Sequence, residues 1–190
     1  MSTPTTPYLS VGPYQEVVNG ISTVFAFSDG VAKLTGPRGA GKTAALRELV
    51  RELRNEEFEV VEFAVPPRSP DDLQASLIRQ FRLGADVSFR KALLRHFASR
   101  PRDQQRLILV FDDAQQFSIP TLQALHSLRE IDNSGLRLIS LLLCGDKTLN
   151  ALLNHPDLAT LQNDVNLAYT LGPLDDEELS EFCSAWLLQQ

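Results

Sequence analysis

The sequence predicts an α/β fold, a three-layer α-β-α sandwich in which helices cover both faces of a five-stranded, mainly parallel sheet. Short apolar runs alternate along the chain with longer segments of helical periodicity, and this alternation is typical of such folds. Two runs, 107–111 and 136–144, are mostly or wholly apolar, as expected of central strands buried on both faces. A length of 190 residues fits about one domain, whose core needs no disulfide or metal.

Residues at the start of the chain lead into a glycine-rich loop. Residues 1–12 are rich in Ser, Thr and Pro and are expected to form a flexible arm, so that 13–190 make up the domain. Apolar residues recur at helical spacing over 14–25, which predicts the first helix. Residues 25–35 predict either a hairpin or a loop that leads into a strand over 31–35.

After the loop, the chain alternates between helical and strand patterns. Ser69 has the chemistry of a helix N-cap, and Pro120 lies where the first turn of a helix tolerates proline. The acidic run 175–178 suits the positive end of a last helix. The expected elements are helices over 43–54, 69–81, 88–99, 118–131 and 147–154, and strands over 58–63, 107–111, 136–144 and 167–171.

Composition and charge exclude several classes of protein. Hydrophobic residues make up 43% and charged residues 22%, which is typical of a globular domain. The net charge of −6 disfavours general binding to nucleic acid, which is a possible but not a favoured partner. The arginine-rich stretch 90–106 could contact a phosphate backbone or an acidic partner, and we favour the simpler interpretation of a solvated helix face.

The chain shows no sign of a membrane or secreted protein. No apolar stretch approaches the roughly 20 residues of a membrane span, and residues 1–9 lack the features of a signal peptide. Cys144 and Cys183 lie in apolar runs, so we expect buried thiols and no disulfide. These features predict a cytoplasmic protein, either free or held at the inner face of the membrane by a partner or a further segment.

Residues 36–43, Gly-Pro-Arg-Gly-Ala-Gly-Lys-Thr, match the phosphate-binding pattern G-x-x-x-x-G-K-[ST] at every required position. The motif lies between a strand and a helix, so that backbone N–H groups and the helix N-terminus can point at a phosphate. Lys42 can reach the β- and γ-phosphates, and the Thr43 hydroxyl can bind Mg²⁺. The alternative is a glycine-rich turn with an accidental lysine, and the complete motif in this context argues against it. The residues expected to hold the nucleotide are Gly36, Pro37, Arg38, Gly39, Ala40, Gly41, Lys42, Thr43 and Ala44.

Two carboxylates follow the predicted strand 107–111. Ligands of open α/β sheets bind at the carboxyl ends of the strands, so Asp112 and Asp113 are expected beside the phosphate loop. Asp112 would hold Mg²⁺ through water. Asp113 stands where many ATPases have a Glu that polarises the attacking water, and its shorter side chain reaches less far. Taken alone, the pair could also be an ordinary Asp-rich turn.

The order of these motifs resembles that of the AAA+ ATPase superfamily. After the phosphate loop come Val-Phe-Asp-Asp-Ala-Gln at 110–115, Leu-Leu-Cys-Gly-Asp-Lys-Thr-Leu at 142–149 and Gly-Pro-Leu followed by acids at 172–177. The chain is similar to the branch containing bacterial general secretion pathway protein A and transposition ATP-binding proteins. It also resembles the ATPase-like region of cell-division proteins with a peptidoglycan-binding tail. The resemblance covers about 14–188 and implies a P-loop NTPase fold, ATP and Mg²⁺ as ligands, and a protein partner or homo-oligomer.

Three departures from the family pattern concern hydrolysis. Asp113 replaces the Glu of the family, and Asp146 aligns with a polar sensor residue, which places an anion on the γ-phosphate side. Residues 162–163, Gln-Asn, align with a Gln-Arg pair, so the arginine that the family supplies in trans is missing. The residues after Trp186 are too few for a helical lid, which is expected to be largely absent. The resemblance thus implies Lys42, Asp113 and Asp146 as the catalytic residues of a slow hydrolase.

The leading hypothesis is therefore an ATP-binding domain that works as a slow ATPase or a nucleotide switch. It would act through a protein partner in bacterial envelope, secretion or division machinery. One alternative is a degenerate module that serves as a non-catalytic interaction scaffold, and another is an ATP-dependent DNA transposition or regulatory factor. A small-molecule kinase with the same loop is a further alternative, although no acceptor-binding arginines are evident.

Overall fold

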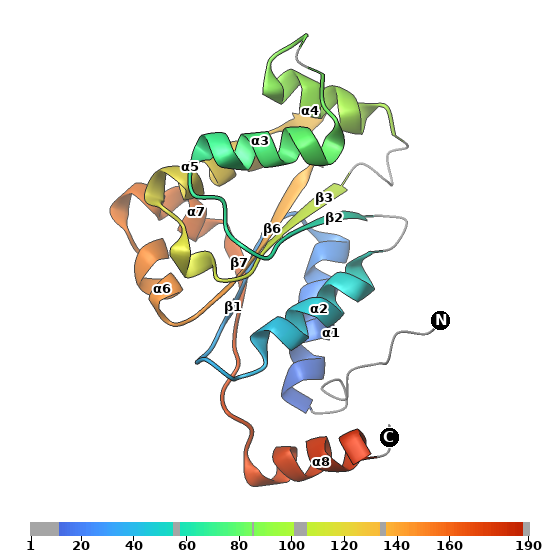
Figure 1. Cartoon of the computed structure of the whole chain (residues 1–190), viewed down its shortest axis with the longest axis vertical. Coiled ribbons are helices and arrows are strands. Elements are labelled where there is room, and N and C mark those ends of the chain that lie inside the picture. Colours follow the sequence, from blue (N-terminus) through green and yellow to red (C-terminus); the bar gives the residue numbers. More distant parts are fainter. Residues whose placement is uncertain (1–11, 55–57, 85, 101–105, 134–135, 188–190) are drawn as a thin grey trace.

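The computed structural model describes residues 12–54, 58–84, 86–100, 106–133 and 136–187. They form three layers, with a central sheet between two layers of helices (Figure 1). This confirms the predicted α/β sandwich. Apart from Gly12, the predicted arm lies outside the described residues. None of the helices in the described ranges combines the length and apolar character needed to cross a membrane.

The central sheet has five strands, and every neighbouring pair is parallel. The strand order β2-β3-β6-β1-β7 places the strand that precedes the phosphate loop in the interior of the sheet. Such an order requires crossover connections, which the helices provide. The strands are β1 (Val31–Thr35), β2 (Phe58–Phe63), β3 (Arg106–Phe111), β6 (Ile139–Gly145) and β7 (Val165–Thr170).

The helices bury two separate cores, one on each face of the sheet. Residues of the central strands alternate between them: Leu109 and Phe111 enter one core, and Ile108 and Val110 enter the other. The core that contains Ile108 and Val110, here the second core, also contains residues of α1 (Gly12–Phe27) and α2 (Lys42–Leu53). The first contains α3 (Pro70–Phe81), α4 (Phe89–Ala98), α5 (Ile119–Arg129), α6 (Thr148–Leu153) and α7 (Ala159–Asn163), with short 3₁₀ turns η3 (Ala114–Gln116) and η4 (Pro156–Leu158).

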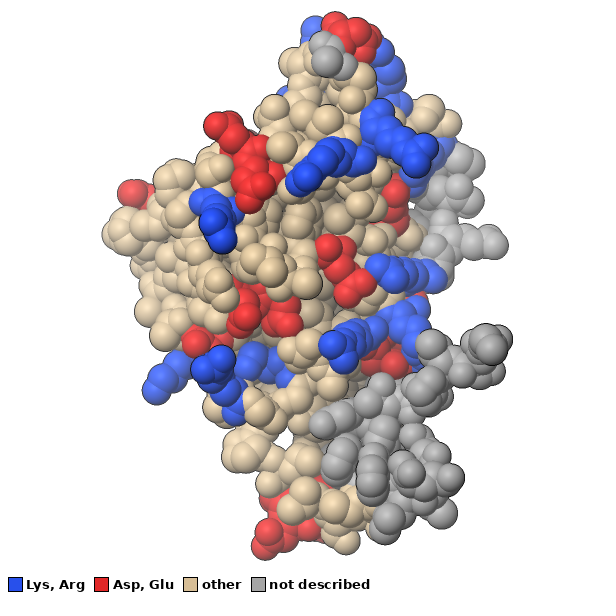
Figure 2. All heavy atoms as spheres, in the orientation of Figure 1, with Lys and Arg blue, Asp and Glu red and all other residues tan. Residues whose placement is uncertain are grey.

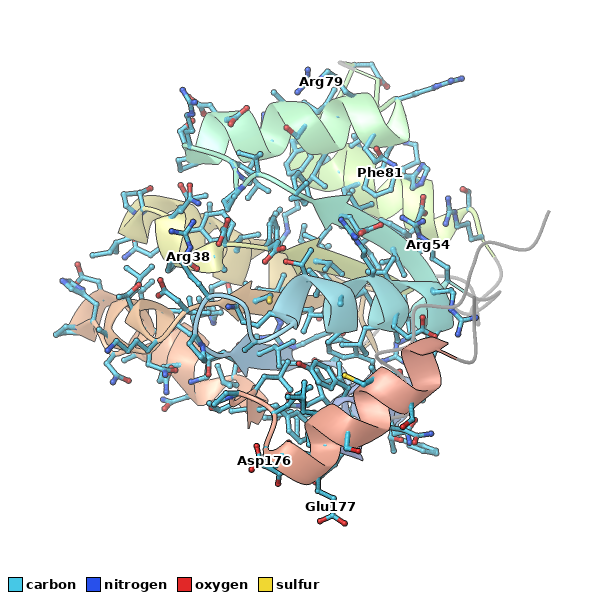
Figure 3. All side chains as sticks on the ribbon, turned by 60° about the horizontal axis from the view of Figure 1, so that its bottom comes forward. Arg38, Arg54, Arg79, Phe81, Asp176 and Glu177 are labelled. Atoms are coloured by element: carbon cyan, nitrogen blue, oxygen red, sulfur yellow. The ribbon has the colours of Figure 1, made fainter. Side chains whose placement is uncertain are left out.

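The last helix, α8 (Asp176–Leu187), begins with the predicted acidic cap. The N–H of Asp175 donates to Glu178, and the N–H of Glu178 donates to Asp175, each at 2.8 Å. This reciprocal pair is a capping box, which satisfies two N–H groups that the helix cannot. Asp176 and Glu177 mark this helix start in Figure 3, at the opposite end of the view from Arg79 on α3.

Three local expectations were wrong. The hairpin alternative for 25–35 is wrong, because Phe25 continues the buried stripe of α1 and 25–27 are its last turn, whereas the other alternative, a loop that leads into a strand over 31–35, is confirmed. The predicted strand 136–144 is divided: β5 (Leu136–Arg137) pairs antiparallel with β4 (Asp132–Asn133), and β6 begins at Ile139. Cys183 is exposed on α8, whereas Cys144 is buried as expected.

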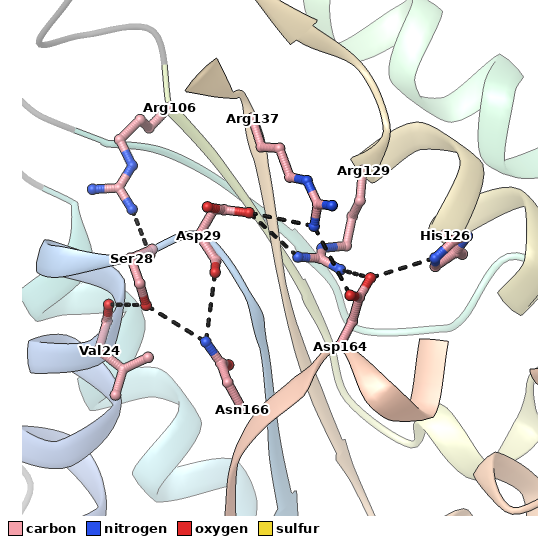
Figure 4. A network of polar contacts seen from close by, with 9 residues as sticks. All are labelled: Val24, Ser28, Asp29, Arg106, His126, Arg129, Arg137, Asp164 and Asn166. Carbon is pink, nitrogen blue, oxygen red and sulfur yellow. Dashed lines mark hydrogen bonds and ion pairs between the residues drawn. The ribbon is translucent and has the colours of Figure 1, made fainter. Parts of the chain in front are cut away.

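A network of ions holds together the amino ends of the strands (Figure 4). Arg129, at the end of α5, is only 2% exposed and pairs with Asp164 before β7 and, at 3.6 Å, with Asp29 before β1. Arg137 lies 3.7 Å from Asp29 and 3.9 Å from Asp164. His126 Nε2 lies 3.4 Å from Asp164. These contacts fix two turns and one helix end relative to the sheet.

We expect Arg129→Leu to destabilise the fold by at least about 2 kcal/mol. Its loss leaves the Asp164 and Asp29 carboxylates facing an apolar side chain. The expected loss stays below the roughly 3–5 kcal/mol typical of fully buried pairs, because the Asp164 side chain is 25% exposed. Urea unfolding measures it. Arg137→Leu is the control, since Arg137 is 47% exposed and should cost under about 1 kcal/mol. Equal losses for the two variants would contradict this assignment.

Candidate functional site

The phosphate loop joins β1 to α2 at the carboxyl edge of the sheet. Gly39 and Gly41 have φ angles of 83° and 77°, a left-handed conformation that glycine adopts without strain. Gly41 precedes the first turn of α2, and no side chain caps that helix. In the described part of the chain, the N–H groups of Gly39, Gly41, Lys42 and Thr43 donate to no acceptor. Free N–H groups at a helix N-terminus form an anion site.

The Lys42 ammonium lies against the first half of the loop. Its Nζ donates to the carbonyl oxygens of Gly36 and Pro37, each at 2.9 Å. These two contacts hold the cation beside the free N–H groups, so that an entering phosphate meets a positive charge and several backbone donors together.

Thr43 and Asp112, the two residues expected to bind Mg²⁺, contact each other at the carboxyl edge of the sheet. The Thr43 hydroxyl donates to Asp112 Oδ2 at 2.8 Å, and Asp112 Oδ1 accepts the N–H of Asp113 at 2.9 Å. A hydroxyl and a carboxylate are oxygen donors, which suit Mg²⁺. Within the described ranges, no group of three or more His, Cys, Asp or Glu residues could hold a metal. One hydroxyl and one carboxylate oxygen fit Mg²⁺, which usually keeps several water and phosphate ligands beside one or two protein oxygens.

Gln115 links the end of β3 to the end of β6. Its Nε2 donates to Asp113 Oδ1 at 2.9 Å, and its Oε1 accepts the N–H of Asp146 at 3.2 Å. Asp113 has a φ of 51°, so a left-handed residue turns the chain into this contact. A Cβ on Gly145 would lie 2.5 Å from Gln115 Oε1, so a larger residue at 145 would have to displace the Gln115 side chain from this position. Gln115 belongs to the motif at 110–115 but had no predicted role of its own, although its position two residues after Asp113 is a usable signal.

Asp146 lies beside the loop, with its carboxylate already engaged. It accepts hydrogen bonds from the N–H and the hydroxyl of Thr148 at the start of α6. These bonds hold the pKa of Asp146 below its ordinary value, and Lys42 lowers it further. Asp146 lines a pocket of about 370 Å³ together with Gly36, Pro37 and Arg38. The expected position beside the phosphate loop is observed, and a catalytic role for Asp146 stays a prediction.

The thiol of Cys144 is not available for chemistry at this site. It is buried at the end of β6, and this burial, followed by the neighbouring Asp112 carboxylate, raises its pKa above the ordinary value. A protonated, buried thiol is a poor nucleophile. Packing in the core is therefore the role that the structure supports for Cys144.

The described arginines of the stretch 90–106 make contacts within the chain, and residues 101–105 lie outside the described residues. Arg95 pairs with Asp86, Arg100 pairs with Glu59, and Arg90 and Arg106 donate to backbone carbonyl oxygens. On the face shown in Figure 2, basic and acidic side chains are intermixed. These contacts support the interpretation of a solvated, internally paired surface over that of a strip for phosphate backbones.

Comparisons with known proteins agree with this geometry. A family model described as an AAA domain matches residues 26–153. General secretion pathway protein A of Aeromonas hydrophila is 27% identical over 158 residues, which are 80% of this chain and 29% of that protein. The fold is similar to the ORC2 protein of Aeropyrum pernix in its ADP form, with a TM-score of 0.68, 13% identity, and coverage of 91% of this chain and 52% of that chain. Cdc6p of Pyrobaculum aerophilum gives a TM-score of 0.62 at 20% identity, with 90% and 48% covered.

We expect Lys42→Ala to weaken the binding of ATP·Mg²⁺ by at least about tenfold, on the order of 1.4 kcal/mol, because it removes the ammonium group held against the loop. Isothermal calorimetry measures the change. Lys91→Ala, an exposed lysine on α4, is the matched control and should bind as tightly as the wild type. An unchanged affinity in Lys42→Ala would mean that the nucleotide binds elsewhere.

Proposed function

The chain belongs to the AAA domain family, and on that premise we propose that it binds ATP·Mg²⁺ and works as a slow ATPase or nucleotide switch. The observation that carries the proposal is the set of free N–H groups in the phosphate loop, beside Lys42 and the Thr43–Asp112 pair. Backbone donors and a cation bind phosphates, and the oxygen pair can hold the Mg²⁺ that neutralises them. Gly36–Ala44 would hold the nucleotide.

ATP is the proposed nucleotide in preference to GTP. The sequence shows no N-K-x-D pattern of the kind that recognises guanine. One structural neighbour, the ORC2 protein of Aeropyrum pernix, was solved in an ADP form. A competition titration in which GTP displaces ATP would reverse this assignment.

Slow hydrolysis is proposed from the groups beside the γ-phosphate position. Asp113 would orient the attacking water, but its side chain is short and already accepts a hydrogen bond from Gln115. Asp146 adds a second negative charge on this side. At the end of α7, Gln162 and Asn163 provide no arginine, and such a finger is worth about 10³–10⁵ in rate where an enzyme has one.

The proposed setting is a protein partner, or a further copy of the chain, in bacterial envelope, secretion or division machinery. The similarity to General secretion pathway protein A supports secretion, and the chain spans 29% of that protein. A cytoplasmic location is part of the same proposal. Binding of γ-phosphate would order the loops at the sheet edge and so change the surface that a partner meets.

A scaffold without catalysis is the second candidate function. The absence of arginine at 162–163 and the short Asp113 side chain favour it over a fast enzyme. A scaffold of this kind would bind nucleotide weakly or not at all, whereas a switch must bind ATP and ADP differently. Titrations with both nucleotides separate the two.

We expect phosphate release by the wild type to lie well below the roughly 1–10³ s⁻¹ typical of enzymes. Asp113→Glu restores the reach that Asp lacks at equal charge, so turnover should rise if geometry limits the reaction. It should stay flat if the missing arginine limits the reaction. Asp113→Asn is the control and should abolish turnover. A fast wild-type rate that is unchanged in Asp113→Asn would mean that a residue other than Asp113 orients the attacking water.

Self-association is expected to be weak or dependent on nucleotide, because no arginine at 162–163 can reach a neighbour's phosphates. Light scattering with and without a non-hydrolysable ATP analogue measures the assembly state. A stable hexamer in the absence of nucleotide is the result that rules this out.

A further inference from the structure

Tyr14 contacts the phosphate loop, although it lies outside the phosphate-binding motif. It belongs to the first turn of α1, and its side chain is only 3% exposed. Its hydroxyl donates a buried hydrogen bond of 2.6 Å to the carbonyl oxygen of Ala40, 26 residues further along the chain. Ala40 is a central residue of the loop and is itself buried. A tyrosine from α1 therefore holds a peptide group of the nucleotide site.

This contact determines which way the next N–H group points. The peptide bond between Ala40 and Gly41 is trans and planar, so its C=O and N–H point in opposite directions. Because the carbonyl oxygen of Ala40 is directed at Tyr14, the N–H of Gly41 is directed away from Tyr14. That N–H donates to no acceptor in the described part of the chain.

The packing of the loop on Tyr14 is tight enough to transmit this restraint. A Cβ on Gly41 would lie 2.5 Å from the Tyr14 hydroxyl oxygen, closer than any real contact. Tyr14 is itself fixed, because Val17, Val18 and Ile21 of the same helix are buried in the core shared with α2. The restraint comes from a packed helix and not from another loop.

We infer that Tyr14 is a positioning residue for the phosphates of the nucleotide. Its hydroxyl keeps the Ala40–Gly41 peptide in the orientation that presents the Gly41 N–H to a phosphate oxygen. The inference rests on the proposed function and extends the phosphate site to α1. Without this hydrogen bond, the Ala40–Gly41 peptide could rotate, and a phosphate would then have to order the donor that it binds.

The test is Tyr14→Phe, which keeps the ring in the core and removes only the hydroxyl. The affinities for ATP·Mg²⁺, ADP·Mg²⁺ and Mg²⁺-pyrophosphate should each fall about five- to tenfold by calorimetry, since all three engage the loop through phosphates. The matched control is Tyr169→Phe. The Tyr169 hydroxyl lies against Gly20 of α1, away from the phosphate loop, so the nucleotide affinities of this variant should equal those of the wild type. Thermal unfolding confirms that both variants are folded at the temperature of the titration.

A second readout needs no nucleotide. In backbone amide spectra of the free protein, Tyr14→Phe should shift or broaden the signals of Gly39, Gly41 and Lys42, while Tyr169→Phe should leave them in place. If the wild type binds no nucleotide and these signals still move, the proposed function fails, and Tyr14 orients the loop peptide without positioning a nucleotide. Unchanged affinity with unchanged loop signals in Tyr14→Phe overturns the inference, and so do equal losses of affinity in both variants.

Discussion

The nucleotide site depends on one constraint: the loop must be ordered while its N–H groups stay without protein partners. Unpaired backbone donors cost free energy, so a loop that keeps several needs support from elsewhere. The chain supplies that support through the carbonyl oxygens. Lys42 donates to Gly36 and Pro37, Tyr14 donates to Ala40, and the N–H of Ala40 donates to Pro37. The protein therefore satisfies the carbonyl oxygens of Gly36, Pro37 and Ala40 and leaves the N–H donors for an anion.

The carboxylates of the site are also held by hydrogen bonds within the protein, and here the charged groups are the acceptors. Each carboxylate at this edge already accepts a hydrogen bond from a neutral group: Asp112 from Thr43, Asp113 from Gln115 and Asp146 from Thr148. Neutral donors hold the carboxylates in place without cancelling their charge. The charge thus stays available to a ligand at this edge of the sheet.

The two edges of the sheet differ in how their charged groups are used. At the amino ends, the Arg129 network pairs its charges with one another and joins the turns before β1 and β7 to α5. At the carboxyl ends, charges and donors are left open to a ligand. Parallel strands make this division possible, because all five amino ends lie at one edge and all five carboxyl ends lie at the other.

The sequence alone determined the fold class, the phosphate loop and the acids after β3, because each depends on local patterns that span a few residues. It misplaced the end of α1 and the start of β6, where local patterns were ambiguous. Only the tertiary structure decided the strand order, the bridge from Gln115 to Asp146 and the hydrogen bond from Tyr14 to Ala40. These contacts join residues that are distant along the chain. Their formation depends on how two cores pack against one sheet, which periodicity does not encode.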